Sequence, residues 1–288
     1  MSRSSSNARP LAVRLVPAAP LAVLVALAAW ALLTYAISRE PGVDVAAYWN
    51  AAERLRNGEP LYAGGASNAS DLYRYTPLFA YVWVPLTFLP RDAVTAGWVG
   101  LMVAAAILST LPLLRRGPAG LAAWAIFTPL QLGGAVFGNV QPLLVLMLLW
   151  GVERRSGPLW IAIGASLKAV PLLLALVYAG RRQWVSFGLS VLFTALLWSP
   201  ALLYELRGYA VDAGQAAFLF SIPPAYFAVV GLGIGATIAL AATRYGWLTA
   251  ATTVALSLPR FFVYDVTYLM LGALPAIRAA SRSARSIE

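Results

Sequence analysis

Long apolar runs separated by short arginine-bearing turns recur along the whole chain of 288 residues. An α-helix needs about 20 apolar residues to cross the roughly 30 Å hydrocarbon core of a bilayer. Runs of that length lie near residues 17–37, 93–114 and 184–204, whereas the runs near 77–90 and 139–152 are too short to cross alone. The pattern predicts an all-α fold, a polytopic transmembrane helical bundle that mixes full spans with short or re-entrant helices.

One apolar segment, residues 158–179, carries arginine pairs beyond both of its ends and has Lys168 and Pro171 in its middle. Basic residues next to a span favour the cytoplasmic side, so both ends are expected on that side. We therefore interpret this segment as a hairpin of two half-helices. Broken helices at membrane depth are tolerated where protein or a water-filled cavity covers them.

The longest polar stretch, residues 38–76, follows the first apolar run and faces outward if the N-terminal arginines lie in the cytoplasm. Within it, the sequence DVAAYWNAAERLRNG repeats its apolar residues at helical spacing and ends on Gly58. The apolar face comprises Val45, Tyr48, Trp49, Ala52 and Leu55. We expect an outer-face helix that lies in the membrane interface.

The chain is predicted to form one transmembrane domain with two cytoplasmic tails. The N-terminal tail is residues 1–16, the domain is residues 17–279 with its outer loop at 38–76, and the C-terminal tail is residues 280–288. The sequence shows no soluble domain and no convincing internal repeat.

Composition narrows the possible chemistry. Apolar and aromatic residues make up 60% of the chain and charged residues 11%, which excludes an ordinary soluble core. The net charge of +10 comes from basic residues scattered at segment ends, which favours contacts with anionic membrane lipids over nucleic acid. Cysteine and histidine are absent, so thiol nucleophiles, imidazole bases and the usual zinc ligands are excluded. The groups that remain available for catalysis or binding are carboxylates, amides, hydroxyls, arginine and one lysine.

Asp44 opens the interfacial helix soon after the first span, which places a carboxylate at the outer membrane surface. There it could act as a general base on an acceptor hydroxyl. The alternative is a helix cap, because aspartate is among the best N-cap residues.

Lys168 and Asp265 are ionisable residues inside apolar segments, and such residues are functional candidates by default because they are costly there. Lys168 could bind a phosphate oxygen, or its stem could snorkel to the interface or pair with a structural carboxylate. Asp265 needs a partner, which Arg260 or Lys168 could provide, so a structural ion pair competes with a catalytic role.

The remaining candidates are polar residues at the ends of apolar segments. Asn139 and Gln141 begin a short apolar helix, where their amides could bind sugar hydroxyls or instead cap and join helices. Asp71, Arg74 and Tyr75 precede the segment that re-enters the membrane, where Arg74 suits phosphate recognition and interfacial anchoring is the alternative. Tyr48, on the interfacial helix, completes the candidate substrate-binding set.

Five stretches resemble, in the same order, the characteristic stretches of glycosyltransferase family 87. They are GVDVAAYWNAAERLRNGEPLY, YRYTPLFAYVWVPLTFLP, FGNVQPLLVLMLLWGVERRSG, ASLKAVPLL and LPRFFVYDVTYL. The resemblance implies a GT-C-like membrane enzyme that takes a sugar, commonly mannose or arabinofuranose, from a polyprenyl phosphate carrier. The chain looks shorter than typical members, and its GNVQ motif departs from the expected spacing of glycine and glutamine.

The resemblance also implies a mechanism in which Asp44 is the base and the sugar is transferred with inversion to a glycolipid or polysaccharide acceptor. We expect no cofactor and no metal, with Asp44 and Asp71 as the alternative divalent site. The expected location is the plasma membrane, with the active site on the extracytoplasmic side. A lipid-linked-sugar transporter or flippase, or a noncatalytic membrane subunit, is the alternative function.

Overall fold

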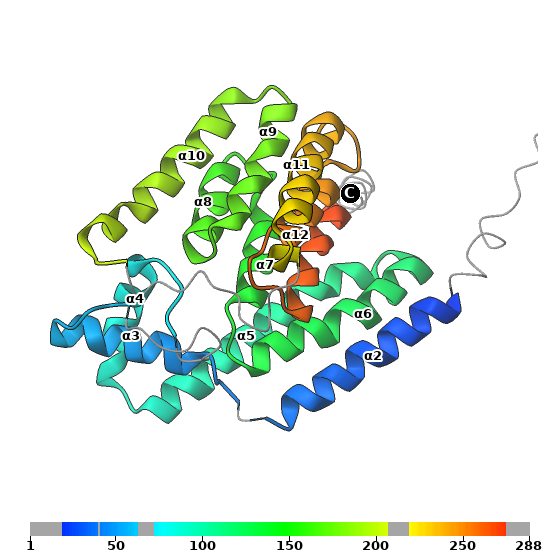
Figure 1. Ribbon diagram of the computed structural model, residues 1–288. Helices are drawn as coiled ribbons and strands as arrows, with labels where there is room; N and C mark the ends of the chain where they lie inside the picture. Colours follow the sequence, from blue (N-terminus) through cyan, green and yellow to red (C-terminus); the bar gives the residue numbers. More distant parts are fainter. Residues whose placement is uncertain (1–18, 40, 63–71, 207–218, 275–288) are drawn as a thin grey trace, which may run out of the picture.

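The computed structural model describes residues 19–39, 41–62, 72–206 and 219–274, and every regular element in these ranges is helical (Figure 1). The longer helices are α2 (Ala19–Ile37), α5 (Arg91–Leu114), α6 (Gly117–Val136), α10 (Trp184–Trp198) and α11 (Pro223–Leu240). The shorter α-helices are α3 (Val45–Asn57), α4 (Pro77–Trp83), α7 (Gln141–Gly151), α8 (Gly157–Leu167), α9 (Leu176–Gly180) and α12 (Gly246–Leu256). The 3-10 segments are η2 (Val84–Phe88), η3 (Val170–Ala175), η4 (Ser199–Leu203), η6 (Leu219–Ser221) and η7 (Val263–Ala273). The predicted all-α bundle is confirmed, while the tails 1–16 and 280–288 lie outside the described residues.

Among the described residues, four helical segments are long and apolar enough to cross a bilayer. They are Arg91–Leu114, Gly117–Val136, Trp184–Leu203 and Pro223–Leu240. Their outward faces carry large apolar side chains, such as Val185, which is 77% exposed, and Leu232, which is 75% exposed. Soluble monomers rarely expose contiguous apolar faces of this extent, whereas lipid chains accept them. The chain is a polytopic membrane protein.

Helix α3 is the helix predicted from the sequence DVAAYWNAAERLRNG. Val45, Tyr48 and Trp49 on its apolar face are buried, and the helix packs against α4 and η2. It ends at Gly58, whose φ of 72° lies in the left-handed region that favours glycine. The element and its buried face are confirmed, and its position in the membrane interface stays a prediction.

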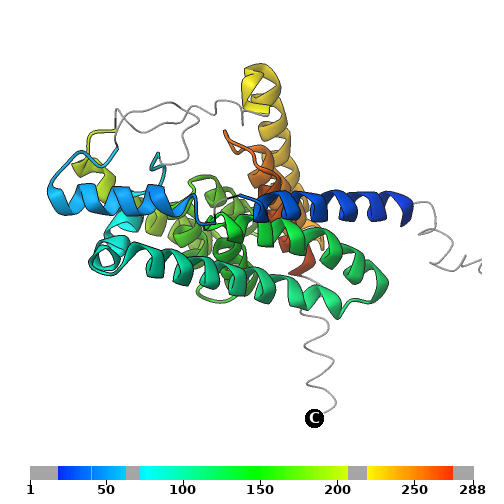
Figure 2. The same ribbon diagram turned by 90° about the horizontal axis from the view of Figure 1, so that it is seen from below.

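The segment Pro77–Phe88, formed by α4 and η2, is too short to cross a membrane. At 1.5 Å per helical residue it reaches about 18 Å, against roughly 30 Å of hydrocarbon. Proline occupies the first turn of both α4 and η2, where its missing N–H removes no helical hydrogen bond. The segment packs on α3 and leads into α5 (Figure 2), and its re-entry into the membrane stays a prediction.

The predicted hairpin of two half-helices is confirmed, and its turn lies at Lys168. Helix α8 ends there because Lys168 has extended backbone angles, φ −139° and ψ 118°, and η3 and α9 then run back beside it (Figure 1). At the open end of the hairpin, the Tyr178 hydroxyl donates a hydrogen bond to the Val152 carbonyl, next to the start of α8 at Gly157. The fold thus presents the only lysine of the chain at a turn.

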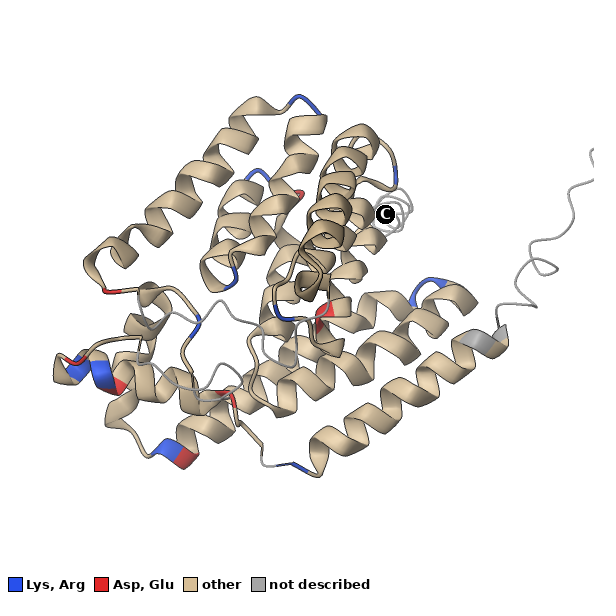
Figure 3. Cartoon of the chain, in the orientation of Figure 1, with Lys and Arg blue, Asp and Glu red and all other residues tan. Residues whose placement is uncertain are grey.

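The turns after α7, α9 and α11 carry arginine (Lys and Arg are blue in Figure 3). Contacts place these turns near the start of α8, whereas Lys168 follows the end of α8. There, Arg181 forms an ion pair with Glu153 at 3.0 Å and donates a second hydrogen bond, of 2.8 Å, to the Ala241 carbonyl. The Trp247 indole also donates to Glu153. These contacts tie together the turns after α7, α9 and α11.

At the opposite end, two glycine turns join the α2–α3 connection to the α6–α7 connection. Gly42 donates a backbone hydrogen bond of 2.8 Å to Val136, and Asp44 donates one of 2.9 Å to Phe137. Gly42 has a φ of 75° and Gly138 a φ of 74°, values that residues with a side chain rarely adopt. Two chain reversals almost 100 residues apart in sequence therefore lie against each other.

Replacing Gly138 by alanine is expected to destabilise the protein by about 1–3 kcal/mol. The new Cβ would lie 2.7 Å from Val45 Cγ2 and 3.2 Å from the Gly42 Cα, and the backbone would keep a strained positive φ. Thermal unfolding of the purified protein measures the change. Gly235→Ala is the matched control, because a Cβ at this helical position meets no atom within 4 Å. Equal unfolding temperatures for both variants and the wild type would contradict the prediction.

Candidate active site

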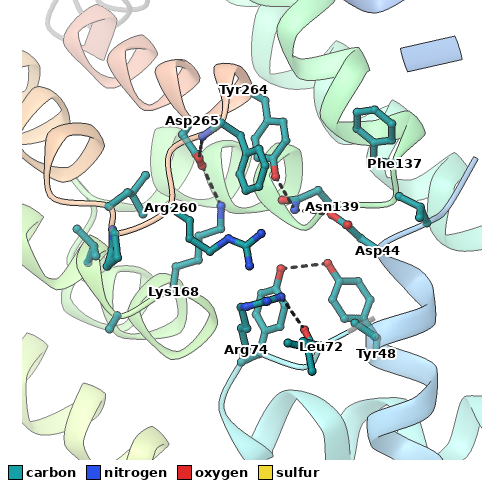
Figure 4. Close-up of a pocket in the computed structure, with 18 of the residues that line it drawn as sticks. Asp44, Tyr48, Leu72, Arg74, Phe137, Asn139, Lys168, Arg260, Tyr264 and Asp265 are labelled. Carbon is teal, nitrogen blue, oxygen red and sulfur yellow. Dashed lines mark hydrogen bonds and ion pairs between the residues drawn. The ribbon is translucent and has the colours of Figure 1, made fainter. Parts of the chain in front are cut away.

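A cavity of about 580 Å³ opens at the end of the bundle where the glycine turns and the Lys168 turn meet (Figure 4). Its wall is largely apolar and aromatic and includes Trp198, Phe262 and Tyr264. Five charged side chains also line it: Asp44, Arg74, Lys168, Arg260 and Asp265. They come from turns and helix ends that are far apart in sequence. The five side chains therefore come together only when the bundle is folded.

Asp44 lines the cavity with its carboxylate, and the alternative of a helix cap is wrong. Its backbone is in the α region, and its side chain makes no capping hydrogen bond to α3. The carboxylate oxygen Oδ2 instead accepts a hydrogen bond of 2.7 Å from the Asn139 amide. The backbone bond from Asp44 to Phe137 turns the residue toward the α6–α7 connection and away from the first amides of α3.

Lys168 is held by two acceptors at the bottom of its turn. Its Nζ donates to Asp265 Oδ1 at 2.9 Å and to Gln141 Oε1 at 3.0 Å. The Asp265 side chain is 1% exposed and that of Lys168 is 18% exposed, so the pair is nearly buried while the lysine still reaches the cavity. The second oxygen of Asp265 accepts the Phe262 N–H at 2.9 Å, which fixes the start of η7. Of the two partners considered for Asp265, the structure selects Lys168.

Arg260 is a cavity residue that the sequence analysis considered only as a partner for Asp265. It follows α12, and its guanidinium points into the cavity between Lys168 and Arg74 (Figure 4). Its Cζ lies 5.5 Å from the centroid of the Phe262 ring. Its position in LPRFFVYD, between an apolar helix and an aromatic stretch, could have indicated a cavity residue. An arginine in such a position needs contact with water or an anion.

Two tyrosine hydroxyls meet at the wall beside Asp44. The hydroxyl oxygens of Tyr48 and Tyr75 lie 3.2 Å apart. Their rings pack edge to face, with 5.2 Å between the ring centroids. Burial raises the pKa of both phenols, and the negative charge of Asp44 adds to the rise. Both hydroxyls therefore stay protonated and can donate hydrogen bonds.

Opposing influences act on the pKa of the Asp44 carboxyl. Burial raises its pKa above the usual value for aspartate, whereas the Asn139 hydrogen bond and the positive charges of Lys168, Arg260 and Arg74 hold part of that rise back. A carboxylate with a raised pKa is a stronger base than a solvated one. The site can thus offer a proton acceptor beside several cations, the combination needed to deprotonate a hydroxyl and stabilise a departing anion.

Most predicted site residues meet at the cavity. Asp44, Tyr48, Arg74, Tyr75, Asn139, Lys168 and Asp265 all line it. Gln141 is fully buried and binds Lys168 instead of lining the cavity. Asp71 lies outside the described residues, so the alternative divalent site that includes it stays untested. Within the described ranges, no group of three or more aspartate, glutamate, histidine or cysteine side chains could hold a metal ion.

The fold is that of a membrane protein with a charged cavity, and a comparison with known families adds to this picture. The model of glycosyltransferase family 87 matches residues 73–208 of the chain. This match indicates membrane glycosyltransferase activity. The matched region includes Arg74, Tyr75, Asn139, Gln141 and Lys168. No curated protein and no solved structure matches the chain.

Proposed function

We propose that the protein transfers a sugar from a polyprenyl phosphate donor to a hydroxyl of a glycolipid or polysaccharide, with Asp44 as the general base. The observation that carries the proposal is that one cavity holds both the Asp44 carboxylate and three cationic side chains, Arg74, Lys168 and Arg260. A carboxylate suits removal of the acceptor proton, and cations suit the charge that develops on a leaving phosphate.

In the proposed reaction, Asp44 takes the proton of the acceptor hydroxyl while the hydroxyl oxygen attacks the anomeric carbon. The new bond between carbon and the acceptor oxygen forms as the bond to the phosphate oxygen breaks. Polyprenyl phosphate leaves with the electron pair of that bond, and the anomeric configuration inverts. Arg74, Lys168 and Arg260 stabilise the leaving phosphate, and the hydroxyls of Tyr48 and Tyr75 can donate hydrogen bonds to the substrates.

A lipid-linked donor is favoured by the apolar part of the cavity wall. Trp198, Val170 and Leu258 line the same cavity as the charged residues. An isoprenoid chain gains free energy when such surface is removed from water, whereas a nucleotide base and ribose would bring many polar groups that need partners. Mannose or a similar sugar is the expected cargo.

The extracytoplasmic location of the site is supported by the distribution of arginine. Arg154, Arg181 and Arg244 belong to the turns after α7, α9 and α11, near the start of α8, whereas Lys168 follows the end of α8. Basic turns favour the cytoplasm, so the cavity is assigned to the outer face of the plasma membrane.

The proposal is tested with the purified protein, membrane lipid extract as acceptor, and radiolabelled donors. Polyprenyl phosphate mannose and polyprenyl phosphate arabinofuranose are compared with GDP-mannose. We expect label to pass to lipid or glycan only from the polyprenyl phosphate donors. Absence of transfer from both of them, or transfer from GDP-mannose alone, would overturn the donor assignment. Movement of the labelled donor across a vesicle membrane without transfer would instead identify a flippase.

A further inference from the structure

We propose that Asn139 is the positioning residue of the base: its amide holds one oxygen of Asp44 and leaves the other to face the acceptor hydroxyl. The inference rests on the proposed role of Asp44, and it replaces the expectation that Asn139 binds sugar directly. It gives the GNVQ stretch a specific task within this chain.

The orientation of the Asn139 amide follows from its hydrogen bonds. Its oxygen Oδ1 accepts the backbone N–H of Gln141 at 2.9 Å, so the NH₂ group must point the other way. That group donates to Asp44 Oδ2 at 2.7 Å and to the Tyr264 hydroxyl at 3.2 Å. Both N–H bonds are thus engaged within the protein, and the side chain has little capacity left for a sugar.

The backbone around Asn139 is fixed as firmly as its side chain. Its own N–H donates to the Gly134 carbonyl at 3.0 Å, and the Trp98 indole donates to the Gly138 carbonyl at 2.8 Å. Asn139 itself is 5% exposed, and helix α7 begins two residues later. An amide mounted in this way can hold a carboxylate in one orientation, which flexible surface groups cannot do.

The same hydrogen bond keeps Asp44 in the form that a base requires. Burial raises the pKa of Asp44, and donation from Asn139 is the strongest of the influences that lower it. The other groups that face Asp44 are three cations and three phenols, namely Arg74, Lys168, Arg260, Tyr48, Tyr75 and Tyr264. Removing only the Asn139 donor is therefore expected to raise this pKa, so that Asp44 becomes ionised, and active, only at higher pH.

The test compares the pH dependence of kcat in the wild type, Asn139→Asp and Asn139→Ala. Asn139→Asp keeps the shape and the oxygen that accepts the Gln141 N–H, so α7 keeps its start, but it replaces the donor to Asp44 by a second carboxyl group, whose charge itself raises the pKa of Asp44. Asn139→Ala removes the donor without adding a charge. Both variants are expected to move the acid limb upward by about one to two pH units and to lower kcat at neutral pH by about 10- to 100-fold. KM for the donor is expected to stay within about twofold. The matched controls, Asn57→Asp and Asn57→Ala, alter an exposed asparagine at the end of α3 and should match the wild type.

Each outcome separates the positioning role from the other possibilities. An unchanged acid limb in both Asn139 variants, while Asp44→Asn is inactive, would overturn the inference and leave the proposed base intact. A raised KM with the wild-type pH profile would return Asn139 to direct substrate binding. Full activity of Asp44→Asn would rule Asp44 out as the base, and this inference with it, while sugar transfer itself would stand. Thermal unfolding identifies any preparation that has lost its fold, and Asn139→Ala is the variant that decides, because it adds no charge beside Asp44.

Discussion

Asp44→Asn is expected to lower kcat for sugar transfer by about 10²- to 10⁴-fold, the usual contribution of a general base. The amide has the shape of the carboxylate but cannot accept the proton of the acceptor hydroxyl. Its partner Asn139 and the cations of the cavity remain, so KM for the donor should change little. Initial rates at several donor concentrations give both constants.

The wild-type pH profile provides a second measurement of the same role. The base is active when ionised, so kcat should rise with pH through the pKa of Asp44. Burial raises that pKa, which places the acid limb above the usual aspartate value. Glu53→Gln is the matched control, because this carboxylate on the same helix is 40% exposed and does not line the cavity. Equal rates for Asp44→Asn and the wild type would rule Asp44 out as the base.

Lys168→Met is expected to destabilise the protein by about 3–5 kcal/mol and to abolish transfer, because it leaves a buried carboxylate unpaired. Asp265 is 1% exposed, and Lys168 is its ion-pair partner at 2.9 Å. Thermal or denaturant unfolding in detergent measures the first effect and the transfer assay the second. Glu53→Gln, which removes the charge of the exposed 4.0 Å pair with Arg56, is the control and should cost less than about 1 kcal/mol.

The double variant Lys168→Met with Asp265→Asn separates the structural role of the lysine from its role at the phosphate. Asparagine is neutral and can still accept the Phe262 N–H, so most of the lost stability should return. Transfer should stay low because the cavity still lacks this cation. Recovery of wild-type transfer in the double variant would show that Lys168 acts only as the partner of Asp265.

The sequence predicted those features that depend on short-range patterns. Helix α3 and its buried face follow from residue spacing between Val45 and Gly58. The hairpin at Lys168 follows from a lysine and Pro171 in the middle of an apolar segment with arginine at both ends. In each case the free energy of burying a charge or an apolar helix face depends on the residues of one segment. The sequence of that segment is therefore enough to predict the structure.

The contacts that form the site could not be predicted in the same way. The Asp44–Asn139 hydrogen bond joins positions 95 residues apart, and it depends on positive φ at Gly42 and Gly138. Many membrane glycines serve close packing instead, so a glycine in the sequence does not identify such a turn. Asp265 had two possible cationic partners, and the choice of Lys168 depends on how the hairpin sits beside η7.

The origin of the charged side chains in separate turns has a consequence for biogenesis. Asp44, Lys168 and Arg260 belong to three connections, and no pair of neighbouring helices contains them all. During synthesis, the constellation stays incomplete until the chain has been made past α12. A helix inserted in the wrong orientation would also move its residue to the opposite membrane face. Faulty insertion should therefore yield inactive protein, and not an enzyme with altered substrate preference.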